Sequence, residues 1–166
     1  HLRAAGPLNG LIVASPSNPT GTVFDPAALV EHCAGARITV IADEIYHGLT
    51  FSTPAPTALG SSRDVVVINS FSKYFGMTGW RLGWMVVPSS LVSVIEKLAQ
   101  NLFICASAIS QHAALACFER ETMAIYEARR QEFARRRVLA LGQAKGCAGQ
   151  GNSDSLRFAK RRNICI

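Results

Sequence analysis

Lys73 is the residue of this sequence that is best suited to act as a nucleophile. It stands between Phe71 and Phe75, and apolar neighbours of this kind keep water away from an amine. Desolvation disfavours the charged ammonium form and leaves the amine free to attack a carbonyl carbon. The sequence therefore predicts that Lys73 reacts with an aldehyde or a ketone.

Other polar side chains suit the remaining parts of such a reagent. Arg81 and the two serines Ser70 and Ser72 can hold a phosphate dianion, because a guanidinium donates paired, charge-assisted hydrogen bonds. The carboxylate of Asp43 can keep a ring nitrogen protonated. An aldehyde, a phosphate and a pyridine ring occur together in pyridoxal phosphate, which is the cofactor that these residues predict.

Short apolar runs next to these residues predict the strands that position them. The runs cover residues 10–15, 38–43, 64–70 and 81–87. The last three runs show no alternation of apolar and polar residues, which is typical of strands buried on both faces of an α/β sheet. Because loops at strand ends converge on a crevice in such sheets, we expect the polar residues to meet there.

Helical patterns fill the interval after the first strand and the second half of the chain. Asp25 followed by Pro26 predicts the start of a helix that ends at Gly35. Three more helices are predicted over residues 89–102, 108–118 and 121–141. After Gly142 the helical period stops, so we expect an irregular, basic end over residues 142–166.

Three motifs stand in a fixed order: SNPTG at residues 17–21, ADEIY at 42–46 and SFSKYFGMTGWRLG at 70–83. Together they resemble the successive signatures of the class I aminotransferases, which belong to the fold-type I group of pyridoxal phosphate enzymes. The resemblance implies a three-layer αβα large domain with mostly parallel, buried strands. Residues 1–141 would form an incomplete part of that cofactor-binding domain.

The resemblance also implies a role for each matching residue. Lys73 would form an aldimine with the cofactor aldehyde and later move the substrate proton. Asn18 and Tyr46 would hydrogen-bond the phenolic oxygen of the cofactor, and Asp43 would pair with its pyridinium nitrogen. The catalytic residues would be Lys73, Asp43 and Tyr46. The phosphate would be held by Ser70, Ser72 and Arg81.

The activity implied by the resemblance is the transfer of an amino group between an amino acid and a 2-oxo acid. Family members are usually homodimers with the site at the subunit interface, so a homodimer is expected. Complete members are more than twice as long as this chain, which begins with His1 rather than Met. We therefore expect a central fragment that alone binds pyridoxal phosphate weakly and transaminates poorly or not at all.

Other functions stay open at this point. A decarboxylase or a synthase of the same fold type shares most of these motifs. Some transcription regulators use an aminotransferase-like domain as a ligand sensor, although no helix-turn-helix is recognisable in these residues. Ser70 and Lys73 also fit the SxxK pattern of serine acylation, but the SDN and KTG tripeptides of that class are missing from the sequence.

Charge and hydropathy bear on the possible partners. The net charge of +6 arises after residue 110, because the first 110 residues carry six basic and six acidic side chains. We interpret the arginines of residues 129–137 as a solvated helix face and expect no nucleic-acid partner. No apolar run approaches the ~20 residues of a membrane-spanning helix, which predicts a cytoplasmic protein without membrane contact. Five cysteines without CxxC spacing predict no metal site.

Overall fold

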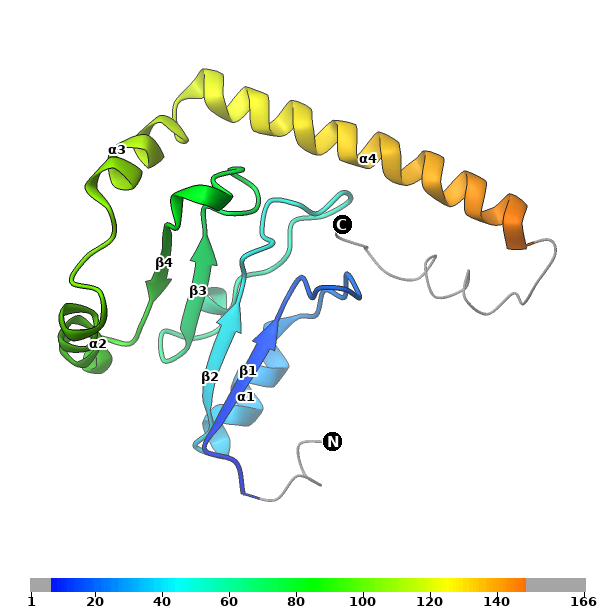
Figure 1. Cartoon of the computed structure of the whole chain (residues 1–166). Helices are drawn as coiled ribbons and strands as arrows, with labels where there is room; N and C mark the ends of the chain where they lie inside the picture. Colours follow the sequence, from blue (N-terminus) through cyan, green and yellow to red (C-terminus); the bar gives the residue numbers. More distant parts are fainter. Residues whose placement is uncertain (1–6, 149–166) are drawn as a thin grey trace.

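The structure, a computed structural model, describes residues 7–148 and is built on a four-stranded sheet (Figure 1). The strands, in their order across the sheet, are β1 (Gly10–Ala14), β2 (Thr39–Asp43), β3 (Val66–Ser70) and β4 (Gly83–Val86). The first three strands are parallel, whereas β4 runs antiparallel to β3. The predicted α/β class with a mostly parallel sheet is therefore confirmed.

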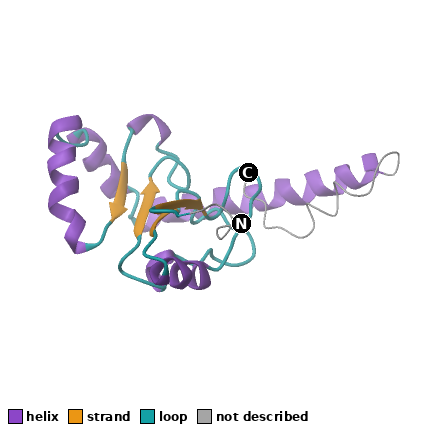
Figure 2. Cartoon of the chain, turned by 90° about the horizontal axis from the view of Figure 1, so that it is seen from below, coloured by secondary structure: helices purple, strands orange, loops and turns teal. Residues whose placement is uncertain are grey.

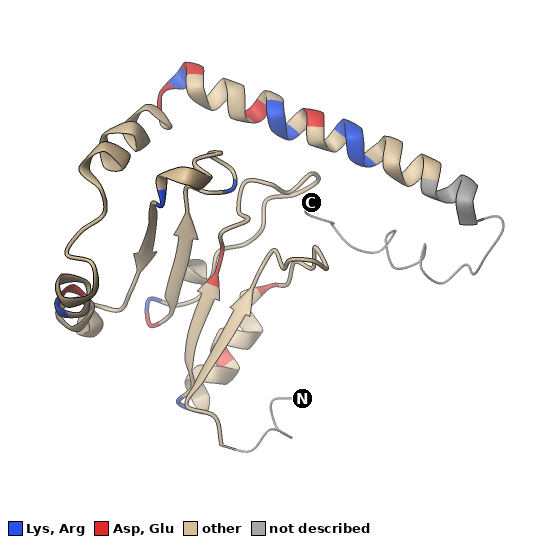
Figure 3. Cartoon of the chain, viewed as in Figure 1, with Lys and Arg blue, Asp and Glu red and all other residues tan. Residues whose placement is uncertain are grey.

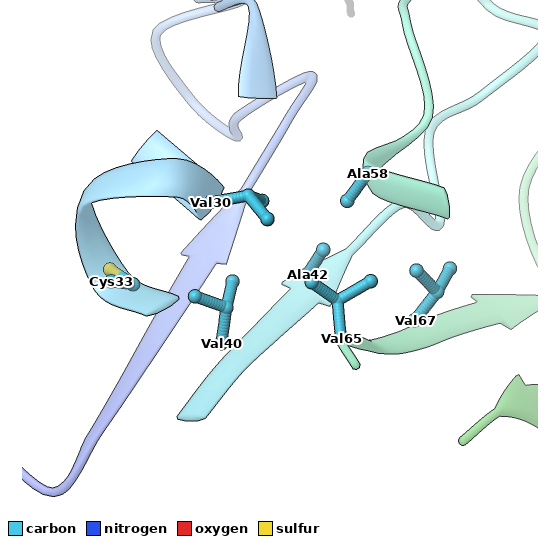
Figure 4. Close-up of a cluster of buried hydrophobic side chains, with 7 residues drawn as sticks. All are labelled: Val30, Cys33, Val40, Ala42, Ala58, Val65 and Val67. Atoms are coloured by element: carbon cyan, nitrogen blue, oxygen red, sulfur yellow. The ribbon is translucent and has the colours of Figure 1, made fainter. Parts of the chain in front are cut away.

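A single helix, α1 (Pro26–Gly35), covers one face of the sheet (Figure 4). It begins as predicted, because the Asp25 carboxylate accepts a 2.9 Å hydrogen bond from the Ala27 amide. Val30 and Cys33 are buried against the strands, and Pro26 at the start of the helix is buried as well. We call the resulting cluster the sheet core, which consists of Val30, Cys33, Val40, Ala42, Ala58, Val65 and Val67. Burial of these apolar side chains fixes α1 against β2 and against the 3₁₀ turn at residues 58–60.

The opposite face of the sheet is exposed at its two edge strands, β1 and β4, within residues 7–148. Side chains alternate along a strand, so Ile12 and Met85 point away from the sheet core, and they are 73% and 48% exposed. All four residues of β4 are exposed. The prediction that the run over residues 81–87 is buried on both faces is therefore wrong. An apolar run has the same sequence pattern whether or not a second layer of helices covers it.

Three helices follow the sheet: α2 (Ser89–Leu102), α3 (Ala108–Ala116) and α4 (Arg120–Ala148). α4 lies across the carboxyl ends of the parallel strands (Figure 1), and seen from below it extends well beyond the sheet (Figure 2). α3 and α4 contribute to a second apolar cluster, the turn core, which consists of Phe71, Met77, Ala114, Cys117 and Tyr126. Among the described residues, no helix is long and apolar enough to cross a membrane.

The last helix is longer than the sequence predicts. An irregular end was expected from residue 142, yet α4 continues to Ala148. Gln, Ala and Lys at residues 143–145 are good helix formers, and the glycine at 142 costs only about 1 kcal/mol relative to alanine. The loss of the apolar period therefore does not end the helix. Residues 149–166 of the expected irregular end lie outside the described part of the chain.

Closely spaced charges of both signs lie along α4 (Figure 3). Arg130 Nε lies 2.8 Å from a carboxylate oxygen of Glu127, and Glu132 pairs with both Arg135 and Arg136 at 2.7 and 2.8 Å. Hydrogen bonds from these two arginines hold the pKa of Glu132 at about 2. Pairs at this spacing stabilise a helix from within, which helps α4 to stay helical where it leaves the sheet.

Candidate functional site

Loops at the carboxyl ends of β1, β2 and β3 bring three of the predicted site residues together. Asn18 follows β1, Tyr46 follows β2 and Lys73 follows β3. The Asn18 side-chain amide donates a 2.9 Å hydrogen bond to the Tyr46 hydroxyl, and Lys73 Nζ lies 5.3 Å from the centre of the Tyr46 ring. An amide, a phenol and an amine therefore gather at the edge where parallel sheets bind ligands.

Backbone hydrogen bonds fix the loop that carries Asn18 at two places, at its first residue and at the turn of residues 17–21. The Ser15 amide donates a 3.1 Å hydrogen bond to the Asp43 carbonyl and so extends the pairing of β1 with β2. The Gly21 amide donates a 2.7 Å hydrogen bond to the Ser17 carbonyl. Gly21 has a φ of 62°, which glycine adopts without strain. Asn18 therefore projects from a closed turn that is anchored to β2.

Asp43 ends β2 on the open face of the sheet, between Ala14 of β1 and Ile68 of β3. One oxygen of its carboxylate accepts a 3.1 Å hydrogen bond from the Ile45 amide, which orients the half-buried side chain. Within residues 7–148, no hydrogen bond or ion pair joins this carboxylate to Asn18, Tyr46 or Lys73. A ring nitrogen that approached this face would meet a carboxylate already held by the backbone.

Lys73 lies in a tight turn that hydrogen bonds hold from two sides. The Gly76 amide donates a 3.1 Å hydrogen bond to the Lys73 carbonyl, and the Thr78 hydroxyl donates one of 2.8 Å to the Ser72 carbonyl. Gly76 has a φ of 68°, a conformation in which glycine is favoured. These contacts fix the backbone from which the Lys73 side chain projects.

The phenylalanines beside Lys73 do not enclose its amine as the sequence predicts. Lys73 is exposed, whereas Phe71 is buried in the turn core with its ring 4.9 Å from that of Phe75. The rings of a compact turn pack beneath it, so the flexible lysine is left on the outer side. The ring that the Lys73 amine meets is that of Tyr46.

Two tyrosines in and around the turn core remain uncharged at neutral pH. The Tyr126 hydroxyl donates a 3.3 Å hydrogen bond to Cys117 Sγ. Burial, together with this hydrogen bond, raises the pKa of Tyr126 to about 12. Burial and the charge of Glu127 also raise the pKa of Tyr74, whose ring lies 5.7 Å from that of Tyr126. The turn that carries Lys73 therefore packs on aromatic side chains, and the two tyrosines among them are uncharged.

The two predicted serines lie together, but Arg81 does not join them. Ser70 Oγ lies 2.9 Å from Ser72 Oγ and accepts a 3.0 Å hydrogen bond from the Ser72 amide. Arg81 has a left-handed backbone with a φ of 51°, and its Nη1 donates a 3.0 Å hydrogen bond to the Thr78 carbonyl. Its guanidinium has no hydrogen bond to either serine in the described structure.

Arg81 instead borders a cavity of about 780 Å³, whose wall also includes Trp80, Phe103, Cys105 and Ser107. None of the other six predicted site residues lines this cavity. Arg81 therefore borders this cavity while one of its guanidinium N–H groups is bound to the Thr78 carbonyl.

Two residues beside this edge, Glu44 and His47, are not among those predicted from the sequence. Glu44 is only 5% exposed and accepts hydrogen bonds from the Ala58 amide at 2.7 Å and the Thr57 hydroxyl at 3.1 Å. The sequence signal that could have identified Glu44 is its place directly after Asp43. The Glu44 amide continues the pairing with β3 through the Ile68 carbonyl, and alternation then turns one of two neighbouring carboxylates inward. A buried carboxylate requires fixed partners, and His47 is one of them.

Comparison with known proteins identifies relatives of the chain. A family model described as aminotransferase class I and II matches residues 2–146. The chain is 44% identical over 140 residues to the valine–pyruvate aminotransferase of Mycobacterium tuberculosis. The alignment covers 81% of this chain and 36% of that protein. It is 39% identical over 146 residues to the (5-formylfuran-3-yl)methyl phosphate transaminase of Methanocaldococcus jannaschii, covering 86% and 39% of the two chains.

Solved structures share the fold. A crystal structure of an aminotransferase from Mycobacterium tuberculosis aligns with a TM-score of 0.81 at 42% identity, over 85% of this chain and 40% of that one. An aspartate aminotransferase from Thermus thermophilus with maleate aligns with a TM-score of 0.84 at 25% identity, over 99% and 43% of the two chains. The chain thus spans less than half the length of the relatives that it matches. On the family model and these relatives together, it belongs to the class I and II aminotransferase family.

Proposed function

We propose that this chain is the cofactor-binding part of an aminotransferase, which transfers an amino group between an amino acid and a 2-oxo acid. Enzymes of this family depend on pyridoxal phosphate. The observation that carries the proposal is the cluster of Asn18, Tyr46 and Lys73 at the carboxyl edge of the sheet. The relatives named above are aminotransferases or transaminases, which favours amino transfer over decarboxylation, synthesis or ligand sensing.

The residues at this edge fit pyridoxal phosphate by donor and acceptor type. The Tyr46 hydroxyl and the Asn18 amide, which already contact each other, would bind the phenolic oxygen of the cofactor. Asp43 would bind the ring nitrogen. The phosphate would be bound by Ser70 and Ser72, whose hydroxyls lie side by side, and by Arg81, whose guanidinium has further N–H donors besides the one bound to the Thr78 carbonyl.

The chemistry that pyridoxal phosphate supplies when bound is reversible reaction with amines and withdrawal of electrons into its ring. Lys73 Nζ would hold the aldehyde carbon and, once released, accept the proton from the α-carbon of the amino acid and return it. The ion pairs of the described residues leave Lys73 without a carboxylate partner, so no ion pair has to break before Nζ reacts. Asp43 would keep a proton on the ring nitrogen.

A homodimer, a cytoplasmic location and a cofactor-binding region over residues 1–141 remain predictions from the sequence.

Borohydride reduction tests the proposal, because it converts a reversible lysine linkage into a stable phosphopyridoxyl label. The 166-residue chain is incubated with excess pyridoxal phosphate and reduced, and its peptides are then examined by mass spectrometry. We expect the label on Lys73. Reduction is irreversible, so even weak binding is detected.

Matched lysine variants make this test specific. Lys73→Arg is expected to lose the label, whereas Lys97→Arg, which changes an exposed lysine of α2, is expected to keep it on Lys73. Equal labelling of Lys73 and Lys97 in the unchanged chain would overturn the proposal, because it would reflect the ordinary reactivity of exposed lysines.

A further inference from the structure

His47 connects the interior of the fold to the loop that carries Asn18. On one side, its Nδ1 lies 3.4 Å from Glu44 Oε2, while the other oxygen of Glu44 is held by the Ala58 amide and the Thr57 hydroxyl. These bonds come from a 3₁₀ turn that packs into the sheet core through Ala58. The imidazole is therefore attached to a carboxylate that cannot easily move.

On the other side, His47 Nε2 lies 3.1 Å from the Ser15 carbonyl oxygen. A carbonyl only accepts, so this nitrogen carries the hydrogen and donates it. Ser15 is buried and fixed by two further bonds: its amide donates to the Asp43 carbonyl, and its hydroxyl accepts from the Phe24 amide at 3.3 Å. His47 thus contacts the loop at its anchored start, close to Asn18.

The Nδ1 side of the ring faces the second carboxylate oxygen of Glu44, at 3.4 Å. The other ionisable groups that line a shared cavity of about 390 Å³ with His47 are Tyr74, Glu127 and Arg130.

Glu127 and Arg130 are paired with each other, and burial keeps Tyr74 in its neutral form. Glu44 is therefore the acidic partner that remains for His47. The imidazole is held between a buried carboxylate and a backbone carbonyl, and both of its nitrogens are engaged.

We propose that His47, held by Glu44, is a positioning residue for the cofactor site. Tyr46 and His47 are neighbours, and they contact the same loop at Asn18 and at Ser15. The His47 contact therefore adds a third hydrogen bond at the anchored start of this loop and helps to set where the Asn18 amide meets the Tyr46 hydroxyl. The effect of His47 on cofactor affinity rests on the proposed function. Its effect on the position of the loop does not, because the loop contacts are present without a cofactor.

Hydrogen exchange in the cofactor-free chain tests the positioning role directly. His47→Ala is expected to accelerate exchange of the Ser15 and Gly21 amides by about tenfold, the effect of losing one buried hydrogen bond. His47→Gln keeps an N–H group that can reach the Ser15 carbonyl, and it is expected to restore most of the protection. His32→Ala, at an exposed histidine of α1, is the control and should change neither amide.

Two results of this experiment would overturn the inference. Unchanged exchange at Ser15 and Gly21 in the His47→Ala chain would show that His47 does not hold the loop. Equal acceleration in α1 and in the loop, in both His47→Ala and His47→Gln, would show that His47 supports the whole fold rather than one loop.

Cofactor affinity provides the second readout. The dissociation constant for pyridoxal phosphate, measured by absorbance titration, is expected to rise about tenfold in His47→Ala and less than about threefold in His47→Gln. If the His47→Ala chain binds pyridoxal phosphate as tightly as the unchanged chain does, the inference fails and the proposed function stands. If the unchanged chain does not bind it at all, the proposed function fails, and the exchange experiment still decides the role of His47.

Discussion

The sheet core and the turn core differ in composition and in what they hold. The sheet core is mainly aliphatic and joins α1 to β2 and to the 3₁₀ turn at residues 58–60. The turn core is rich in aromatic and sulfur-containing side chains, and it packs beneath the turn that carries Lys73. One core therefore sets the position of α1 on the sheet and the other sets the backbone of the proposed nucleophile, so helix placement and site geometry rest on different side chains.

The largest effect is expected from Phe71→Ala in the turn core. The Phe71 ring contacts the rings of Phe75, Trp84 and Phe118 at 4.9, 5.0 and 6.0 Å. Its loss should lower the free energy of unfolding by about 3–5 kcal/mol, as is usual for a buried phenylalanine. Urea unfolding measures this change. Labelling of Lys73 should also fall in the molecules that stay folded, and undiminished labelling would contradict the role given to the turn core.

A smaller and different effect is expected from Val40→Ala in the sheet core. Val40 is 3% exposed, and removal of two methyl groups should lower the free energy of unfolding by about 1–2 kcal/mol. Labelling of Lys73 per folded molecule should stay as in the unchanged chain. A loss of labelling as large as that of Phe71→Ala would show that the two cores do not act separately.

The smallest effect is expected from Tyr126→Phe, and it should depend on pH. The variant loses the hydrogen bond to Cys117, which should cost about 1 kcal/mol at neutral pH. Because the pKa of Tyr126 is raised to about 12 in the folded chain from its ordinary value of 10.0, its contribution is complete below pH 10 and is lost as the pH rises towards 12. The phenylalanine variant has no such loss.

Urea unfolding at several alkaline pH values follows this difference, which should shrink between pH 10 and 12. Val40→Ala, which changes no ionisable group, is the control and should keep a constant difference from the unchanged chain. A constant difference for Tyr126→Phe would contradict a burial-driven shift at this tyrosine.

Part of the site could be predicted because it depends on local sequence and strand direction. Asn18, Tyr46 and Lys73 each follow an apolar run, and parallel strands bring such positions to one edge whatever the loops do in detail. The start of α1 was predictable for the same reason, since Asp25 and Pro26 act within one helical turn. These features need no knowledge of distant contacts.

The rest depends on contacts that the sequence does not display. The direction of the Arg81 side chain follows from a left-handed backbone and from the Thr78 carbonyl. The partners of Glu44 and His47 come from three separate segments. The exposure of β4 depends on whether a helix covers it, and an apolar run carries no information about its cover or its direction.

The two cores also differ in a way that can be followed by thiol chemistry. Cys33 is buried in the sheet core, Cys117 is buried in the turn core, and Cys105 is exposed. Burial raises the pKa of the Cys33 thiol, and Cys117 Sγ lies 3.2 Å from Met77 Sδ. Of these three thiols, an alkylating reagent should therefore modify Cys105 at once, and Cys33 and Cys117 only when their own surroundings open. Two alkylation rates, read from one sample, would report the opening of each core separately.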